Sequence, residues 1–230
     1  NRWLPHGDFD TAHLVQLMAS RRSCRNYSDQ PVDRSILADL VKIGTTAPSS
    51  TNCQKWTFTV LPDRSAVNEF GQRIGLFFKK LNHLAEKRLI CKALKLIGKP
   101  ALEDYYREFY QSVKEGLKAY ELHGRDLLFH GASAVIVVGT RPGGSGRMED
   151  ALLATQNILL AAHSMGLGTC LIGFAVEAMK KDAAIQQFLA IPAEETVCSV
   201  IAVGYPDEQY EGLTGRKKVV LRYREIGIGG

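Results

Sequence analysis

The chain of 230 residues carries 45% hydrophobic and 23% charged residues, so it is long enough to bury a core and does not have the composition of a disordered protein. Its formal net charge at pH 7 is only +5 and its basic residues are scattered, which argues against a nucleic-acid-binding surface. Such a charge distribution suits the binding of a small anionic group better than the binding of an anionic polymer.

The five cysteines are odd in number, lie far apart and form no C-x-x-C pair, so the sequence indicates neither a disulfide framework nor a metal site. A reducing cytoplasm is the simplest location for such a chain. No apolar run approaches the roughly 20 residues of a membrane-spanning helix, and the first residues lack the core of a signal peptide. We therefore expect a cytoplasmic protein without a membrane partner.

The first predicted element is a short amphipathic helix over residues 10–20, capped by Asp10 or Thr11. It leads into the basic segment R-R-S-C-R at residues 21–25. Such a segment can be a solvated basic turn. It can also be an anion clamp, in which guanidinium groups and a hydroxyl bind phosphate oxygens.

Asp33 caps a second predicted helix, which ends near Thr46. The loop A-P-S-S-T-N-C-Q-K-W follows at residues 47–56 and leads into an alternating strand over residues 56–61. Serine, threonine and asparagine are ordinary turn residues and need no ligand. A loop with hydroxyl, amide and backbone N–H groups can also hold a polar heterocycle.

Helical patterns dominate residues 63–125. Asp63 caps a helix that runs to about Lys80, and Pro100 separates two further helices, over residues 86–99 and 101–122. The aromatic side chains of this stretch recur at helical spacing, which is more typical of a core than of a binding surface. The same stretch can nevertheless cover a site.

Strands and helices alternate in the second half of the chain. The predicted elements are a strand buried on both faces at residues 132–140, a helix at 148–164 with Leu152 and Leu153 packed inside, a helix at 176–189 and a strand at 196–204. A basic turn then precedes a short strand that begins near Val219 and has no partner earlier in the sequence. An unpaired strand tends to add to a sheet, so we expect it to pair with its own sheet or with that of a second copy.

The stretch M-G-L-G-T-C-L-I-G-F at residues 165–174 joins the predicted helix at residues 148–164 to the next strand. Gly166 is expected in the left-handed conformation that ends a helix, followed by a buried strand through Ile172. Because glycine has no side chain, the backbone of Ile172 and Gly173 can also face a ligand.

Four separated segments resemble, in sequence and in order, the nitroreductase family of FMN-dependent flavoenzymes. They are R-R-S-C-R, A-P-S-S-T-N-C-Q-K-W, G-L-G-T-C-L-I-G at residues 166–173, and V-G-Y-P followed by G-R-K. The resemblance implies an α+β fold with a mixed β-sheet flanked by helices, in a single FMN-binding domain over residues 1–230. It also implies a homodimer with FMN at the subunit interfaces, a variable helical lid at residues 81–125, and a C-terminal extension at residues 216–230 swapped onto the partner.

The resemblance also implies which residues bind FMN. Those expected at the phosphate are Arg21, Arg22 and Ser23, with Arg216 and Lys217 or Lys218 from the other end of the chain. Arg25 matches the position beside the pyrimidine edge of the ring, where a fixed cation stabilises the anionic reduced flavin. The loop that holds the ring and ribityl chain, partly from the partner subunit, is matched by Pro48, Ser49, Ser50 and Asn52.

Ile172 and Gly173 match the pair whose backbone N–H groups approach flavin N5 and O4, so with Arg25 they are the expected catalytic residues. Several family members have a glutamate at the position of Ile172, and many read Q-P-W where this chain reads Q-K-W, which leaves the orientation of Lys55 open. The sequence shows no metal or general-base constellation, which suits chemistry carried by the cofactor.

We therefore expect an oxidoreductase that passes electrons from NAD(P)H, or from a ferredoxin-type donor, to a nitroaromatic, quinone or similar small acceptor by a ping-pong mechanism. The same scaffold also hosts enzymes that dehalogenate iodotyrosines or fragment FMN, and it could serve as a flavin sensor. The pattern over residues 10–27 resembles the catalytic part of a nitroreductase subgroup fused behind a two-cluster ferredoxin domain, which would favour an iron–sulfur donor.

Overall fold

The computed structural model describes residues 3–87, 89, 96, 98 and 101–224. It divides the chain into two units, one of Arg21–Gln209 and one of the terminal segments Asn1–Ser20 and Tyr210–Gly230. In the part of the chain that is described, no helix is long and apolar enough to cross a membrane. The larger unit holds the sheet and most of the helices.

The sheet of the larger unit has the strand order β1-β2-β4-β3. Its strands are β1 Trp56–Leu61, β2 Ala134–Thr140, β3 Gly168–Leu171 and β4 Thr196–Gly204. All three strand pairs are antiparallel, and the parallel pairing among the described residues is a single bridge between Ser23 and Thr169. The mixed character expected of the sheet is therefore confined to that bridge. The predicted strand at residues 132–140 is confirmed, and β2 is buried along its whole length.

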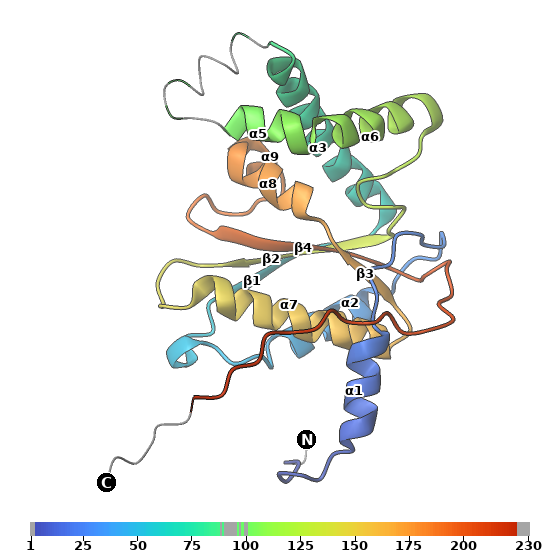
Figure 1. The fold of residues 1–230 in the computed structure, drawn as a ribbon, viewed down its shortest axis with the longest axis vertical. Coiled ribbons are helices and arrows are strands. Elements are labelled where there is room, and N and C mark those ends of the chain that lie inside the picture. The colour runs from blue at the N-terminus through green and yellow to red at the C-terminus, as the bar shows by residue number, and fades with distance from the viewer. Residues whose placement is uncertain (1–2, 88, 90–95, 97, 99–100, 225–230) are drawn as a thin grey trace. The chain divides into compact units, whose positions relative to one another are not determined.

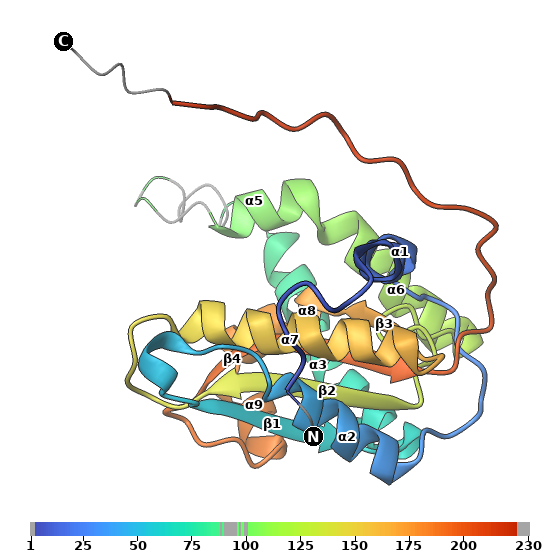
Figure 2. The same cartoon turned by 90° about the horizontal axis from the view of Figure 1, so that it is seen from below.

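Helices cover both faces of the sheet (Figure 1), and Figure 2 shows the same layers from below. One face carries α2 Arg34–Gly44 and α7 Arg147–Ser164, and the other carries α3 Arg64–Ala85, α8 Gly173–Lys181 and α9 Ala183–Phe188. A hydrophobic cluster lies on each side of the sheet. The predicted α+β class is confirmed, as are the caps: Asp33 accepts from Ser35 N–H and Asp63 from Ala66 N–H.

The segment between α3 and β2 differs in detail from the prediction. α3 runs to Ala85 rather than Lys80, because Phe78, Asn82 and Ala85 continue its buried face. The predicted helix over 101–122 is two helices, α5 Ala101–Glu108 and α6 Tyr110–His123, broken at Phe109. The helix predicted over 86–99 falls largely outside the described residues.

Two predictions in the second half are wrong. Leu152 and Leu153 of α7 are each 45% exposed rather than packed inside. The single helix predicted over 176–189 begins earlier, at Gly173, and is interrupted at Asp182, whose carboxylate accepts the N–H of Ala184 at 3.0 Å and so caps a second helix, α9. The sequence at the break reads K-K-D, and the single predicted helix spanned it because the cap that Asp182 provides was not recognised.

The terminal unit contains α1 Thr11–Ser20, as predicted, with Asp10 accepting the N–H of Ala12 at 2.8 Å. Residues 210–224 have no assigned helix or strand. The strand expected from Val219 onward is therefore not formed over the residues described in this single chain. Its exchange between two copies stays a prediction.

Candidate functional site

The R-R-S-C-R segment is joined to the free edge of β3. Ser23 forms its bridge with Thr169, and Cys24 N–H donates to the Thr169 carbonyl at 2.9 Å. A Cβ on Gly168 would lie 2.7 Å from the Cys24 side chain, so only glycine permits this approach. The sequence analysis did not predict this contact.

The V-G-Y-P segment lies against the same stretch. Tyr27 pairs with Pro206, and Ser28 N–H donates to the Tyr205 carbonyl at 2.9 Å. A Cβ on Gly204 would come within 2.8 Å of the Tyr27 ring. Two glycines therefore bring three of the motif segments together at one edge of the sheet.

The chain leaves this edge at the turn from β3 into α8. Ile172 is buried and its N–H donates to the Val200 carbonyl at 2.8 Å, so this N–H is already used within the chain. Gly173 begins α8, whose N-terminus has no side-chain cap. The first N–H groups of a helix have no intrahelical acceptor and carry partial positive charge. A Cβ on Gly173 would meet nothing within 4 Å, so this backbone is accessible.

A cavity of about 950 Å³ lies beside this turn, where β3 has ended and β4 continues; we call it the site cavity. Its lining includes Arg25, Cys170, Ile172 and Gly173, together with residues 198–200 of β4. Its other wall is largely aromatic and comes from α3, α5, the break between α5 and α6, and the start of α8: Phe77, Phe78, Tyr105, Phe109 and Phe174. Part of the segment 81–125 therefore borders the site cavity.

The thiol of Cys170 lines this cavity within the field of two arginines. Burial raises the pKa of Cys170, while Arg25, a hydrogen bond with Ser23, and Arg21 oppose that rise. Burial likewise raises the pKa of Cys24 to about 11. Both thiols are therefore protonated at neutral pH, and neither is poised as a nucleophile.

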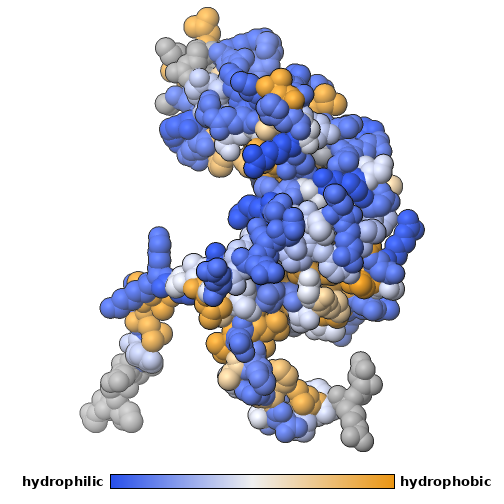
Figure 3. Space-filling view, turned by 90° about the vertical axis from the view of Figure 1, so that its right-hand side faces the viewer, coloured by the Kyte–Doolittle hydropathy of each residue, from blue (hydrophilic) through white to orange (hydrophobic). Residues whose placement is uncertain are grey.

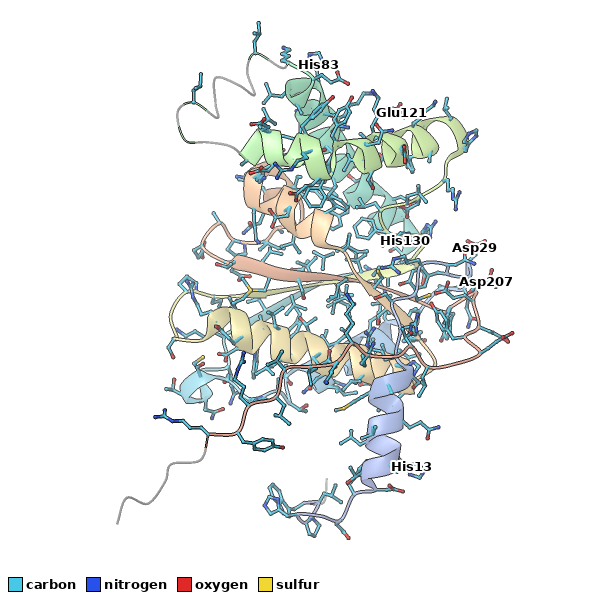
Figure 4. The ribbon with its side chains drawn as sticks, viewed as in Figure 1. His13, Asp29, His83, Glu121, His130 and Asp207 are labelled. Carbon is cyan, nitrogen blue, oxygen red and sulfur yellow. The ribbon has the colours of Figure 1, made fainter. Side chains whose placement is uncertain are left out.

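His130 is a residue of the site cavity that sequence reasoning missed. Its backbone is left-handed, with φ of 57°, and the loop is held by Asp126, whose carboxylate accepts the N–H groups of Leu128, Phe129 and Gly131. Burial lowers the pKa of His130, and the field of Asp126 opposes that shift. Figure 4 shows His130 on the same side of the larger unit as Asp29 and Asp207.

The loop of residues 47–56 is held by the buried carboxylate of Asp150. That carboxylate accepts the N–H of Ser50 at 3.0 Å, its hydroxyl at 3.1 Å, and the thiol of Cys53 at 3.5 Å. The hydroxyl of Ser49 accepts the N–H of Gln54 at 3.0 Å. Asp150 gave no sequence signal because its partners lie about a hundred residues away in the chain.

Two further residues of the loop lie at the surface. Pro48 and Asn52 are exposed, and Asn52 accepts from the Gln54 amide at 2.7 Å. The open question of Lys55 is resolved, since its ammonium donates to the Pro142 carbonyl at 2.8 Å.

The predicted FMN-binding residues of the larger unit form two separate groups. The loop binds Asp150 near the start of α7, whereas Arg21 lies near its end, close enough to His163 to contribute to its lowered pKa after the larger effect of burial. Figures 1 and 2 show the loop in cyan and residues 21–25 in blue at opposite ends of α7. Asp150 and His163 are separated by about 20 Å along the axis, at about 1.5 Å per residue.

Arg216, Lys217 and Lys218 belong to the terminal unit, where they are exposed and lie in a stretch without helix or strand. Their expected role at the phosphate stays a prediction.

Comparison with known proteins identifies the fold and the family. The sequence pattern described as the Nitroreductase family matches residues 18–205, which is most of the chain. The chain belongs to the nitroreductase family. The family predicted from the four motif segments is thereby confirmed.

Individual known proteins are similar to this chain at low identity. The 4-nitrobenzoate reductase of Nocardioides sp. (strain LMS-CY) is 28% identical over 84% of this chain and 81% of its own length. The putative NADH dehydrogenase/NAD(P)H nitroreductase of Archaeoglobus fulgidus is 25% identical over 85% of this chain and 86% of its own. Rat iodotyrosine deiodinase 1 is 23% identical over 84% of this chain and 62% of its own length.

Among solved structures, a nitroreductase with bound FMN from Bacteroides fragilis has a TM-score of 0.63 at 20% identity, and the match covers 90% of this chain and 94% of that one. At this identity the likeness shows the fold, which agrees with the α+β architecture described above.

Proposed function

We propose that this member of the nitroreductase family is an FMN-dependent oxidoreductase that takes electrons from NADH or NADPH and passes them to a small acceptor. The observation that carries the proposal is the site cavity, where Arg25 and the uncapped start of α8 at Gly173 meet. The similarity to an NAD(P)H nitroreductase, to a 4-nitrobenzoate reductase and to a nitroreductase with bound FMN supports it.

The residues present fit FMN. Arg21, Arg22 and Ser23 supply cations and a hydroxyl for its phosphate, and they continue directly into Arg25, which lines the site cavity. The accessible backbone at Gly173 offers N–H donors for polar atoms of the ring. Ile172 N–H is engaged by Val200, so Ile172 would act by holding the turn and presenting an apolar wall.

When bound, FMN would supply the chemistry of accepting a hydride from the nicotinamide and returning the electrons to the acceptor. Arg25 would place a fixed positive charge where negative charge develops. The aromatic wall formed by Phe78, Tyr105 and Phe174 would exclude water from the reacting atoms. Because both reactants would use the same cavity in turn, we propose a ping-pong mechanism.

The two groups of FMN-binding residues make a homodimer part of the proposal. Pro48, Ser49, Ser50 and Asn52 lie at the other end of α7 from Arg21, too far apart to hold one cofactor within a single chain. A second copy would bring its own loop to the site cavity. The exposed leucines on α7, Leu152 and Leu153, would then be buried in the dimer interface.

Steady-state kinetics test this proposal. The FMN-loaded protein should oxidise NADH or NADPH in the presence of 4-nitrobenzoate or a benzoquinone, and double-reciprocal plots at several acceptor concentrations should be parallel. Intersecting lines would contradict the ping-pong mechanism. A protein that neither binds FMN nor oxidises either nicotinamide would contradict the function itself.

The similarity to rat iodotyrosine deiodinase 1 favours one alternative, reductive dehalogenation on the same scaffold. Release of iodide from 3-iodotyrosine by the chemically reduced protein, together with no turnover of nitroaromatics or quinones, would support that alternative over the proposed function. Turnover supported by a reduced ferredoxin and by neither nicotinamide would instead assign the donor to an iron–sulfur protein.

A further inference from the structure

A second cavity, of about 430 Å³, lies between α3 and α6; we call it the α3–α6 chamber. Glycines leave space on both helices: Gly71 and Gly75 lie on one face of α3, and Gly116 lies on α6. A Cβ on Gly116 would meet nothing within 4 Å, and one on Gly75 would make only an ordinary contact with Leu117. The chamber therefore exists because larger side chains are missing at these positions.

The chamber suits an uncharged apolar group. Its walls include Val67, Ile74 and Phe129, each at most 1% exposed. Three charged residues also line it: Lys79, Glu121 and Asp126. Lys79 and Glu121 form a 2.7 Å ion pair with each other and are 65% and 54% exposed, so they lie at the rim. The carboxylate of Asp126 accepts the N–H groups of Leu128, Phe129 and Gly131. Figure 4 labels Glu121 on α6, and the upper part of Figure 3 shows a mainly hydrophilic surface with small separate hydrophobic patches.

The α3–α6 chamber is continuous in its lining with the site cavity. Phe78, Leu127, Leu128 and Phe174 line both. Phe174 follows Gly173 directly, and its ring packs edge-on against Phe78 at 5.5 Å and against Phe109 at 5.9 Å. It is also 36% exposed, so its ring is only partly enclosed by these neighbours. Phe174 thus stands at the boundary between the two spaces.

We propose that the α3–α6 chamber binds the apolar end of an elongated acceptor whose reducible group lies in the site cavity. This inference rests on the proposed function and names the substrate class: a nitroaromatic or quinone with an alkyl or aryl substituent, rather than a compact polar one. Phe174 and Gly116 are the specificity-determining residues, the first at the boundary and the second in the space that the substituent fills.

Filling the chamber tests this. Gly116→Leu places a large side chain in the open space of the chamber. Gly116→Ala is the matched control. Both alanine and leucine have a higher helix propensity than glycine, but alanine leaves the space open. The probes are nitrobenzene and 4-hexylnitrobenzene. Each buried methylene strengthens binding by about fourfold. The FMN-loaded wild type and Gly116→Ala should therefore prefer the hexyl compound by more than tenfold in kcat/KM, and Gly116→Leu should lose most of that preference.

A redox-inert probe separates this inference from the proposed function. Hexylbenzene should raise the Tm of the wild type and of Gly116→Ala, and should leave the Tm of Gly116→Leu unchanged. Its binding requires an open chamber but no electron transfer. An equal preference for both nitro compounds in the wild type would overturn the inference, and so would an equal Tm rise in all three proteins. Absence of all nitro turnover would count against the proposed function, and the hexylbenzene result would still decide whether the chamber binds apolar groups.

Discussion

Replacing Asp150 tests how the loop of residues 47–56 is kept in shape. Asp150→Ala removes the acceptor of the Ser50 N–H and hydroxyl and of the Cys53 thiol, at a carboxylate that is only 5% exposed. The loop also holds Thr51, Asn52 and Gln54 at positive φ, a conformation that persists only where the surroundings impose it. Without the carboxylate we expect the loop to relax.

The magnitude follows from the bonds lost. Hydrogen bonds to a charged group contribute roughly 1.5–3 kcal/mol each. Ser50 donates two of these hydrogen bonds, and because Ser50 is half-buried, water will replace part of their contribution. The third donor, the thiol of Cys53, is weak. We expect the free energy of unfolding to fall by about 2–4 kcal/mol. If the loop binds FMN, the Kd for FMN should rise by about tenfold for each 1.4 kcal/mol lost from the bound state.

Urea unfolding and FMN fluorescence titration measure the two effects. Glu149→Ala is the matched control, because Glu149 is the exposed acidic neighbour in the same first turn of α7 and shares its interaction with the helix dipole. Asp150→Asn retains one acceptor oxygen and should give an intermediate loss. The reasoning would be refuted if Asp150→Ala and Glu149→Ala differed by less than about 0.5 kcal/mol in unfolding free energy.

Three further predictions concern the sheet edge and the site cavity. Gly204→Ala should lower the free energy of unfolding by about 1–3 kcal/mol, because the new Cβ meets the Tyr27 ring at 2.8 Å. The stability of the wild type should fall as the pH drops below 6.5, because the unfolded chain then binds a proton that His130, with its pKa lowered by burial, does not yet take up in the folded state. His130→Asn, which tolerates the left-handed backbone, should reduce that fall. Arg25→Ala should slow FMN reduction by NADH more than it weakens FMN binding, whereas Arg21→Ala should chiefly weaken binding.

Each of these has a direct check. Urea unfolding of Gly204→Ala with unchanged stability would show that the strand tolerates a side chain there. Identical pH profiles of stability for wild type and His130→Asn would contradict a lowered pKa of the half-buried His130 imidazole. Rapid-mixing reduction and FMN titration that change equally in both arginine variants would contradict their separate roles.

Local signals in the sequence were sufficient for much of the fold. The caps at Asp33 and Asp63 and the β-branched run of β2 act within a few residues, so pattern and propensity predicted them. The exposure of Leu152 and Leu153 was not predictable, because helical periodicity shows which residues share a face but not whether that face is covered within one chain.

Only those features of the candidate site that depend on local sequence motifs could be predicted. Arg25, Ile172 and Gly173 were expected together and line one cavity. Asp150, His130 and the contact of Gly204 with Tyr27 were missed, because each depends on residues distant in sequence or on backbone conformation. The motif pattern indicated which residues to expect at the site and gave no information on which buried groups hold them.

The central claim is that this chain transfers electrons through bound FMN, and one anaerobic double-mixing experiment tests it most directly. The FMN-loaded protein is mixed with one equivalent of NADH or NADPH, and then with 4-nitrobenzoate or a benzoquinone, while the flavin absorbance is recorded. We expect the absorbance to fall after the first mixing and to return after the second. Absorbance that stays unchanged with both nicotinamides would contradict the proposed reaction.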